Sequence, residues 1–194
     1  MDALELYRQL KEDFKWEALS RKDWFVDYQN MYTFLGVMSQ RQLYLNVANA
    51  LIDAGEDEKA QEILDRCQAN FPEENFPLET IAVGFTSNDY MVVQMVENYY
   101  YLGEEDKARE LGLKLADGLL DSSRFFLEFS SYSTTSFENC HRCLVYLADV
   151  FKQYGDKELS DKLLASLDIL LRVALGDLEV EGKDSLKVDT TKVE

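Results

Sequence analysis

The stretch ANALIDAGEDEKAQEILDRCQANFP, residues 48–72, decides the fold of this chain. Apolar residues before its glycine recur at the spacing of one helix face, and a second apolar stripe follows the glycine. Gly55 can adopt the left-handed backbone conformation of a helix end, and the acidic residues after it suit the first turn of a new helix. Ala60 is small enough to let two helix backbones approach closely, and Pro72 cannot continue the second helix. The stretch therefore predicts an antiparallel helical hairpin.

This hairpin pattern occurs three times in the chain. The spacing of glycine, acidic residue, lysine and alanine recurs around Gly103, and a third hairpin breaks at Gly155, with Ser160 in place of the alanine. Repeated hairpins are typical of helical repeat proteins, because one hairpin alone cannot bury its apolar face. The four core positions of each first helix are all apolar or aromatic: Tyr44, Val47, Ala48 and Leu51; Val92, Met95, Val96 and Tyr99; Leu144, Leu147, Ala148 and Phe151.

These positions match the preferences of the tetratricopeptide repeat (TPR), although the spacing between hairpins exceeds the roughly 34 residues of that repeat. The sequence predicts an all-α fold of TPR-like antiparallel helical hairpins, stacked in a right-handed α-α superhelix. The expected organisation is one domain over residues 1–176 and a disordered tail over 177–194. Within the domain we expect an N-terminal helix and aromatic-rich segment (1–31), hairpins at 32–77, 78–120 and 138–176, a short helix near 78–86, and a connector of short helix and loop at 121–137.

Composition and charge restrict the possible partners. The formal net charge of −17 would repel nucleic-acid phosphates and an anionic lipid surface, so no nucleic-acid partner and no direct membrane insertion are expected. No stretch approaches the apolar length of a membrane-spanning helix, about 18 residues or more. Residues 1–16 are charged throughout, unlike a secretory signal peptide. The chain is therefore expected to be soluble, and cytoplasmic if it is complete as given.

The N-terminal half carries a more specific resemblance. The string FKWEALSRKDWFVDYQN at residues 14–30 contains an Asp-x-x-Asn motif, and Arg41 follows it. The hairpin then ends in a Phe-Pro-x-x-Asn-x-Pro connector at residues 71–77. Over residues 6–120, and most specifically over 43–77, the chain resembles the soluble C-terminal part of a bacterial family of multipass membrane proteins of unknown function. That family is grouped with protein O-mannosyltransferase-like glycosyltransferases.

The resemblance implies that this chain is a fragment of a larger protein. The sugar-transfer chemistry would then lie in a membrane part outside the chain, and this domain would be membrane-tethered and extracytoplasmic. Its partner would be a polypeptide or peptide segment, which could belong to the parent's own membrane domain.

The predicted site is a groove for a polypeptide. In TPR-type arrays the first helices line the concave face, from positions that alternate with the core ones. Tyrosines mixed with other polar groups there suit an extended peptide or a partner helix. The alternative is that the protein's own loops fill this groove and the tyrosines pack against them. The candidate groove residues are Gln42, Asn49, Asp53, Tyr90, Glu97, Tyr100, Tyr101, Arg142, Asp149 and Lys152.

Cys140, His141 and Cys143 form the one local group of metal-ligand-type side chains. A structural zinc site needs four ligands, and the rest of the chain offers one further cysteine, Cys67, and no other histidine. We interpret the group as the first turn of a helix with both cysteines facing the core, so no metal and no cofactor are expected. The sequence also lacks a glycine-rich phosphate loop and any recognisable nucleophile motif, so no catalytic residue is predicted.

Three functional hypotheses follow from these patterns. The first is a noncatalytic TPR-like interaction domain from a membrane glycosyltransferase-like protein, which recruits or positions a polypeptide. The second is a free-standing cytoplasmic helical adaptor. The third, from a different class, is a small hydrolase or metal protein that uses Cys140, His141 and nearby acidic residues.

Overall fold

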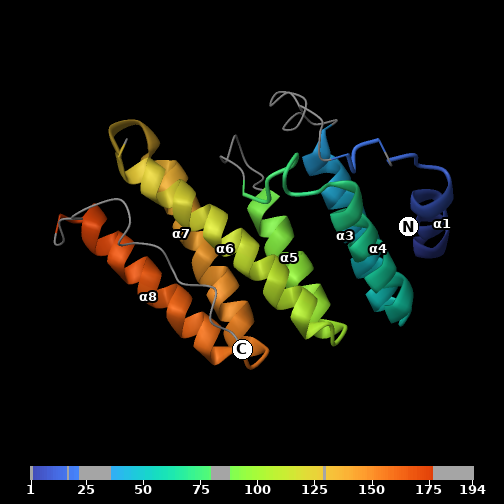
Figure 1. Ribbon diagram of the computed structural model, residues 1–194. Helices are drawn as coiled ribbons and strands as arrows, with labels where there is room; N and C mark the ends of the chain where they lie inside the picture. The colour runs from blue at the N-terminus through green and yellow to red at the C-terminus, as the bar shows by residue number, and fades with distance from the viewer. Residues whose placement is uncertain (1, 17, 22–35, 80–87, 129, 177–194) are drawn as a thin grey trace.

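The computed structural model describes residues 2–16, 18–21, 36–79, 88–128 and 130–176, and every regular element in these ranges is an α-helix (Figure 1). This confirms the all-α prediction. None of the helices within the described ranges is long and apolar enough to cross a membrane. The helices are α1 (Ala3–Glu12), α3 (Val37–Asp53), α4 (Asp57–Asn70), α5 (Asn88–Tyr101), α6 (Glu105–Glu128), α7 (Ser130–Gln153) and α8 (Lys157–Ala174).

The three predicted corners are confirmed. Gly55, Gly103 and Gly155 join α3 to α4, α5 to α6 and α7 to α8, with φ of +74°, +79° and +95°. At each corner the amide of the residue after the glycine donates to the carbonyl five residues before it in the chain, at 2.9, 2.9 and 2.8 Å respectively. This hydrogen bond satisfies a carbonyl that would otherwise lack a partner at the helix end. The three hairpins therefore share one local geometry.

The predicted core is also confirmed. All twelve core positions of the first helices are buried, with at most 2% of each residue exposed. The small residues Ala60, Ala108 and Ser160 lie at equivalent positions in the second helices, and each is 0% exposed. A small side chain at this position allows the two helices of a hairpin to pack closely.

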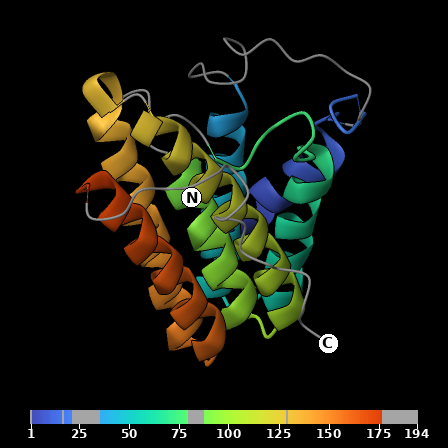
Figure 2. The ribbon, with the colours of Figure 1, turned by 60° about the vertical axis from the view of Figure 1, so that its left-hand side comes forward.

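The first helices pack beside one another, α3 against α5 and α5 against α7. Figures 1 and 2 show α1 and α8 at opposite ends of the array. On the side of the second helices the packing is uneven: α6 lies against both α7 and α8, whereas no comparable packing joins α4 to α5 within the described ranges. The first hairpin therefore stands less closely against the second than the second does against the third.

Gly112 lies where α6 meets α7. A Cβ atom at this position would lie 2.7 Å from Cζ of the buried Phe151 ring, closer than side chains tolerate. The absence of a side chain at Gly112 therefore allows α6 to approach α7.

Gly112→Ala is expected to lower the free energy of unfolding by about 1–2 kcal/mol, because overpacking against Phe151 outweighs the gain in helix propensity. Gly118→Ala, also within α6, is the matched control, since its Cβ would meet only the carboxylate end of the flexible Glu79 side chain. It should leave stability unchanged or raise it. Denaturant unfolding measures both variants, and equal effects would contradict the assignment of Gly112 as a packing contact.

The connector after α4 is held by a buried cation. Arg41, on α3 and 2% exposed, donates through its guanidinium to the carbonyls of Phe76 and Pro77, at 2.6 and 3.0 Å. A longer contact of 3.5 Å reaches the carbonyl of Phe71. The rings of Phe71 and Phe76 meet edge to face at 5.7 Å between centroids, and both are buried. Arg41 and the connector thus form one structural unit.

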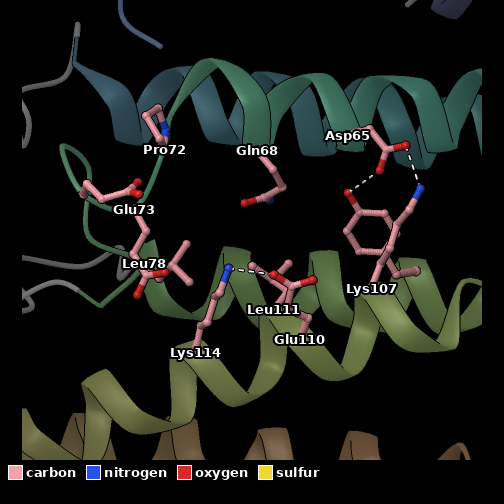
Figure 3. A pocket seen from close by; sticks show the side chains of 11 residues that line it. Asp65, Gln68, Pro72, Glu73, Leu78, Lys107, Glu110, Leu111 and Lys114 are labelled. Atoms are coloured by element: carbon pink, nitrogen blue, oxygen red, sulfur yellow. Dashed lines mark hydrogen bonds and ion pairs between the residues drawn. The ribbon is translucent and has the colours of Figure 1, made fainter. Parts of the chain in front are cut away.

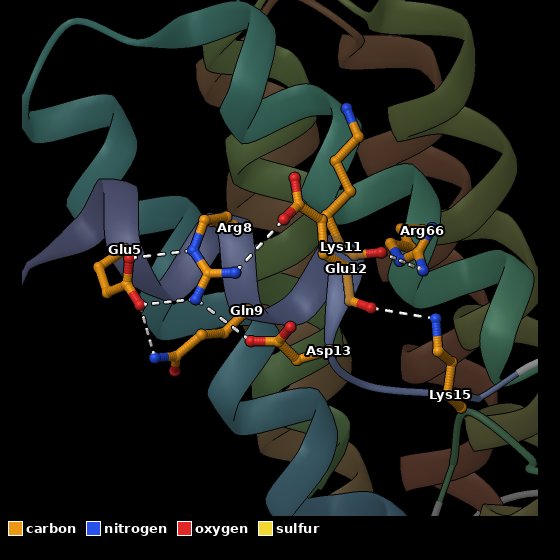
Figure 4. Close-up of polar contacts among 8 residues, drawn as sticks. All are labelled: Glu5, Arg8, Gln9, Lys11, Glu12, Asp13, Lys15 and Arg66. Carbon is orange, nitrogen blue, oxygen red and sulfur yellow. Dashed lines mark hydrogen bonds and ion pairs between the residues drawn. The ribbon is translucent and has the colours of Figure 1, made fainter.

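Helix α1 covers the outer side of the first hairpin (Figure 4). Its Leu10 is buried, and Arg66 of α4 donates to the carbonyls of Leu10 and Lys11 at 3.2 and 3.0 Å. These carbonyls belong to the last turn of α1, where backbone carbonyls find no donor within the helix. On the outer face of α1, Arg8 lies 2.8–3.3 Å from three carboxylates. This end of the array is therefore closed by a charged surface.

The prediction of a loop within residues 121–137 is wrong. Residues 121–128 continue α6, and residues 130–137 already belong to α7. A serine-rich run favours a loop, but here a serine is compatible with the helix. The Ser123 hydroxyl donates to the Leu119 carbonyl at 2.7 Å within α6, so this serine does not end the helix. The aromatic residue Phe126 is buried and fastens this turn to the core. The predicted short helix near 78–86 lies mostly outside the described residues, and the predicted tail at 177–194 lies wholly outside them.

Candidate functional site

The ten predicted groove residues lie on α3, α5 and α7, and the side of these helices that carries them is called the first-helix face below. The face carries amides, carboxylates, two basic groups and tyrosines, and its helices are neighbours. Six of the ten are exposed, three are half-buried and one is buried. The exposed residues are Asn49, Asp53, Tyr101, Arg142, Asp149 and Lys152; the half-buried ones are Gln42, Tyr90 and Glu97; the buried one is Tyr100.

Side-chain hydrogen bonds connect the neighbouring helices across this face. Asn98 of α5 donates to the Asn49 amide oxygen of α3 at 2.7 Å. The Tyr146 hydroxyl of α7 donates to the Glu97 carboxylate of α5 at 3.2 Å. Asn49 and Glu97 occupy equivalent positions in their hairpins, and Asp149 is the third member of the series. The face is therefore continuous over three helices, with a polar group at the equivalent position of each.

Tyr100 does not contribute to an open groove, contrary to the prediction. It is 5% exposed, and its ring stacks on Tyr154 with 5.0 Å between centroids. Its hydroxyl donates to the Asp156 carboxylate, and burial together with this carboxylate raises the pKa of the phenol. Because α5 packs against α7, this side of α5 faces protein and not solvent. Tyr100 joins adjacent hairpins, which makes it part of the interior.

Tyr101, the next residue, remains available for contact. It is 61% exposed, so its ring offers apolar area and a hydroxyl on the first-helix face. Tyr90 is intermediate: its ring lies 6.4 Å from that of Tyr146. The structure therefore places some tyrosines of the predicted groove between the helices and leaves Tyr101 outside.

A cleft between α4 and α6 was not expected from the sequence (Figure 3). Its volume is about 350 Å³, and it opens where the first and second hairpins diverge. At one end the Tyr99 hydroxyl donates to Asp65 at 3.0 Å, and Lys107 pairs with the same carboxylate at 2.8 Å. The lining residues are Asp65, Gln68, Pro72, Glu73, Glu74, Leu78, Tyr99, Lys107, Glu110, Leu111 and Lys114.

Both lysines of this cleft are already paired with carboxylates. Lys114 pairs with Glu110 at 2.8 Å, and the nearby carboxylates raise the pKa of its ammonium group. Burial and the Asp65 carboxylate raise the pKa of the Tyr99 phenol, which disfavours its use as a base. The cleft is thus a polar recess whose two lysines are held in ion pairs. The seven-residue spacing of Lys107 and Lys114 places them on one helix face and was the available sequence signal.

The cysteines of the Cys140-His141-Arg142-Cys143 group face the core, as predicted. Cys140 and Cys143 are 4% and 1% exposed, and burial raises the pKa of the Cys140 thiol to about 12. A thiol that stays protonated is a poor nucleophile and a poor metal ligand. Their predicted place in the first turn of a helix is wrong, because α7 begins at Ser130. Among the described residues, no group of three or more His, Cys, Asp and Glu side chains is placed to hold a metal ion.

A scan against models of protein families and searches of curated proteins and of solved structures found no match to this chain.

Proposed function

We propose that this chain is a noncatalytic, TPR-like protein-interaction domain that holds an extended polypeptide or a partner helix on its first-helix face. The observation that carries the proposal is the continuity of this face over three equivalent helices, with Asn49, Glu97 and Asp149 at equivalent positions before the three corner glycines. The exposed Asn49 and Asp149 and the half-buried Glu97 can pair with peptide groups of an extended ligand, and Tyr101 adds aromatic contact area. The right-handed superhelical stacking of the hairpins is part of the same proposal.

The setting that we propose is the soluble C-terminal part of a multipass, O-mannosyltransferase-like membrane protein. In support, two features of the resemblance, Arg41 and the connector at residues 71–77, act together in the structure, since the arginine binds the connector's carbonyls. The domain would then be extracytoplasmic and would position a polypeptide for the parent protein. The same face would also serve a free-standing cytoplasmic adaptor, and the length of the natural reading frame separates these two settings.

Peptide selection tests the proposed binding face. A displayed library of random peptides is selected on the immobilised chain, and the affinity of an enriched peptide is measured by calorimetry. The double variant Asn49→Ala/Tyr101→Ala should weaken binding at least tenfold, about 1.4 kcal/mol, because both side chains are exposed on the first-helix face.

Glu110→Ala/Lys114→Ala is the matched control, since both residues are exposed and line the α4–α6 cleft instead. It should leave the affinity unchanged. Loss of binding in the control and not in the first variant would place the ligand in the cleft and overturn the proposal. Failure to enrich any peptide would also count against it.

A further inference from the structure

Helix α8 is the last of the described helices, and one of its sides packs against no other described helix. Its Leu163, Leu167 and Leu170 are at most 6% exposed, and they face α6 and α7. On the other side Leu164 and Ile169 are each 41% exposed, and Leu175, directly after the helix, is 75% exposed. Figures 1 and 2 show no helix packed on this outer side. Helical arrays normally end in a polar outer surface, so these leucines and this isoleucine are a departure.

The opposite end of the array makes the contrast clear. There the outer face of α1 carries Arg8 among three carboxylates (Figure 4), which suits an end that faces water. On α1 the exposed large apolar side chain is that of Leu4. The two ends are therefore built differently, and the α8 end has the character of a contact surface.

The charges of α8 also differ from those of the whole chain. The chain has a net charge of −17, but α8 has three acidic and three basic residues and is neutral. Helices α1, α3 and α7 are neutral as well, so neutrality alone does not select α8, but it allows two copies of α8 to approach without net repulsion between the helices. Asp168 and Arg172 are exposed on its outer side, and within the described ranges neither has an ion-pair partner.

The spacing of the outer residues is self-complementary. Residues 165, 168, 172 and 175 alternate three and four apart, which is the spacing of a helix–helix seam. In an antiparallel pair of α8 helices centred near residue 170, Asp168 of each copy lies opposite Arg172 of the other. Leu164 of each copy then lies beside Leu175 of the other. The twofold symmetry forms both ion pairs at once.

We propose that the outer face of α8 is the interface of a homodimer, in which two copies pair their α8 helices in antiparallel orientation. A single pair of helices of this length, about 27 Å, buries less area than the roughly 800 Å² per partner of a standard interface. The dimer is therefore weak, with a Kd in the micromolar range. The proposal does not depend on the peptide-binding function, because the first-helix face lies on other helices.

A charge-exchange experiment on the full chain tests this interface. Sedimentation equilibrium over a range of concentrations should show a monomer–dimer equilibrium for the wild type. Asp168→Arg and Arg172→Asp should each raise the Kd at least tenfold, because each places like charges opposite one another. The double variant D168R/R172D restores opposite charges and should return the Kd to within about threefold of the wild type.

The outcomes separate the possible occupants of α8. Both residues are exposed, so circular dichroism and thermal unfolding should be the same for all four proteins. A wild-type chain that stays monomeric at every concentration overturns the proposal and points to a helix of a different protein as the occupant. A dimer that neither single variant weakens also overturns it, since its interface would then lie elsewhere on the chain.

Discussion

Replacing Arg41 with methionine is expected to lower the free energy of unfolding by about 3 kcal/mol. Methionine keeps the apolar length of the side chain but donates no hydrogen bond. The carbonyls of Phe76 and Pro77 would lose the donors that lie 2.6 and 3.0 Å away, in a region where Arg41 is 2% exposed. A buried carbonyl without a donor retains its full cost of desolvation. Denaturant unfolding followed by circular dichroism measures the loss.

Two further variants make this result specific to the guanidinium. Arg41→Lys keeps the charge but cannot reach two carbonyls with the same planar fork, so its stability should fall between those of the wild type and the methionine variant. Arg142→Met makes the same chemical change at an exposed position of α7 and should alter stability by less than about 0.5 kcal/mol. If R41M and R142M lost equal stability, Arg41 would not be what holds the connector.

Replacing Ala108 with leucine is expected to cost at least about 3 kcal/mol, or to prevent folding of the second hairpin. Ala108 is 0% exposed on α6, which packs against α5, so three additional carbon atoms cannot be placed without displacing its neighbours. Ala60→Leu should have a similar effect, because Ala60 occupies the equivalent position in the first hairpin. Thermal and denaturant unfolding measure both.

The third hairpin provides a test in the opposite direction. The Ser160 hydroxyl is buried and has no hydrogen-bond partner among the residues that the structure describes, so Ser160→Ala should raise stability by about 1 kcal/mol. Ala69→Leu, at an exposed position of α4, is the control for the change from alanine to leucine and should be nearly neutral. A destabilised S160A variant, or equal losses in A108L and A69L, would show that the equivalent positions do not share one packing role.

The sequence predicted which helices carry the candidate groove residues, but it did not predict which of these side chains are exposed. The sequence placed Tyr100 and Tyr101 together in the groove, yet one is 5% and the other 61% exposed. Helical periodicity reports the direction of a side chain on its own helix, and it does not report which neighbouring helix covers that direction. The α4–α6 cleft was missed for the same reason, because it depends on how far the first and second hairpins diverge. The TPR-like superhelix remains a prediction.

The sequence by itself determined the corners, the small residues and the core of this protein. A glycine at the corner, a small residue five positions later and apolar residues at helical spacing are local properties, and they recur around Gly55, Gly103 and Gly155. The tertiary structure alone decided what Arg41 binds, how closely Gly112 brings α6 to α7, and which apolar residues of α8 are exposed. These features depend on distances between helices that are far apart in the chain, and those distances result from the packing of all side chains together.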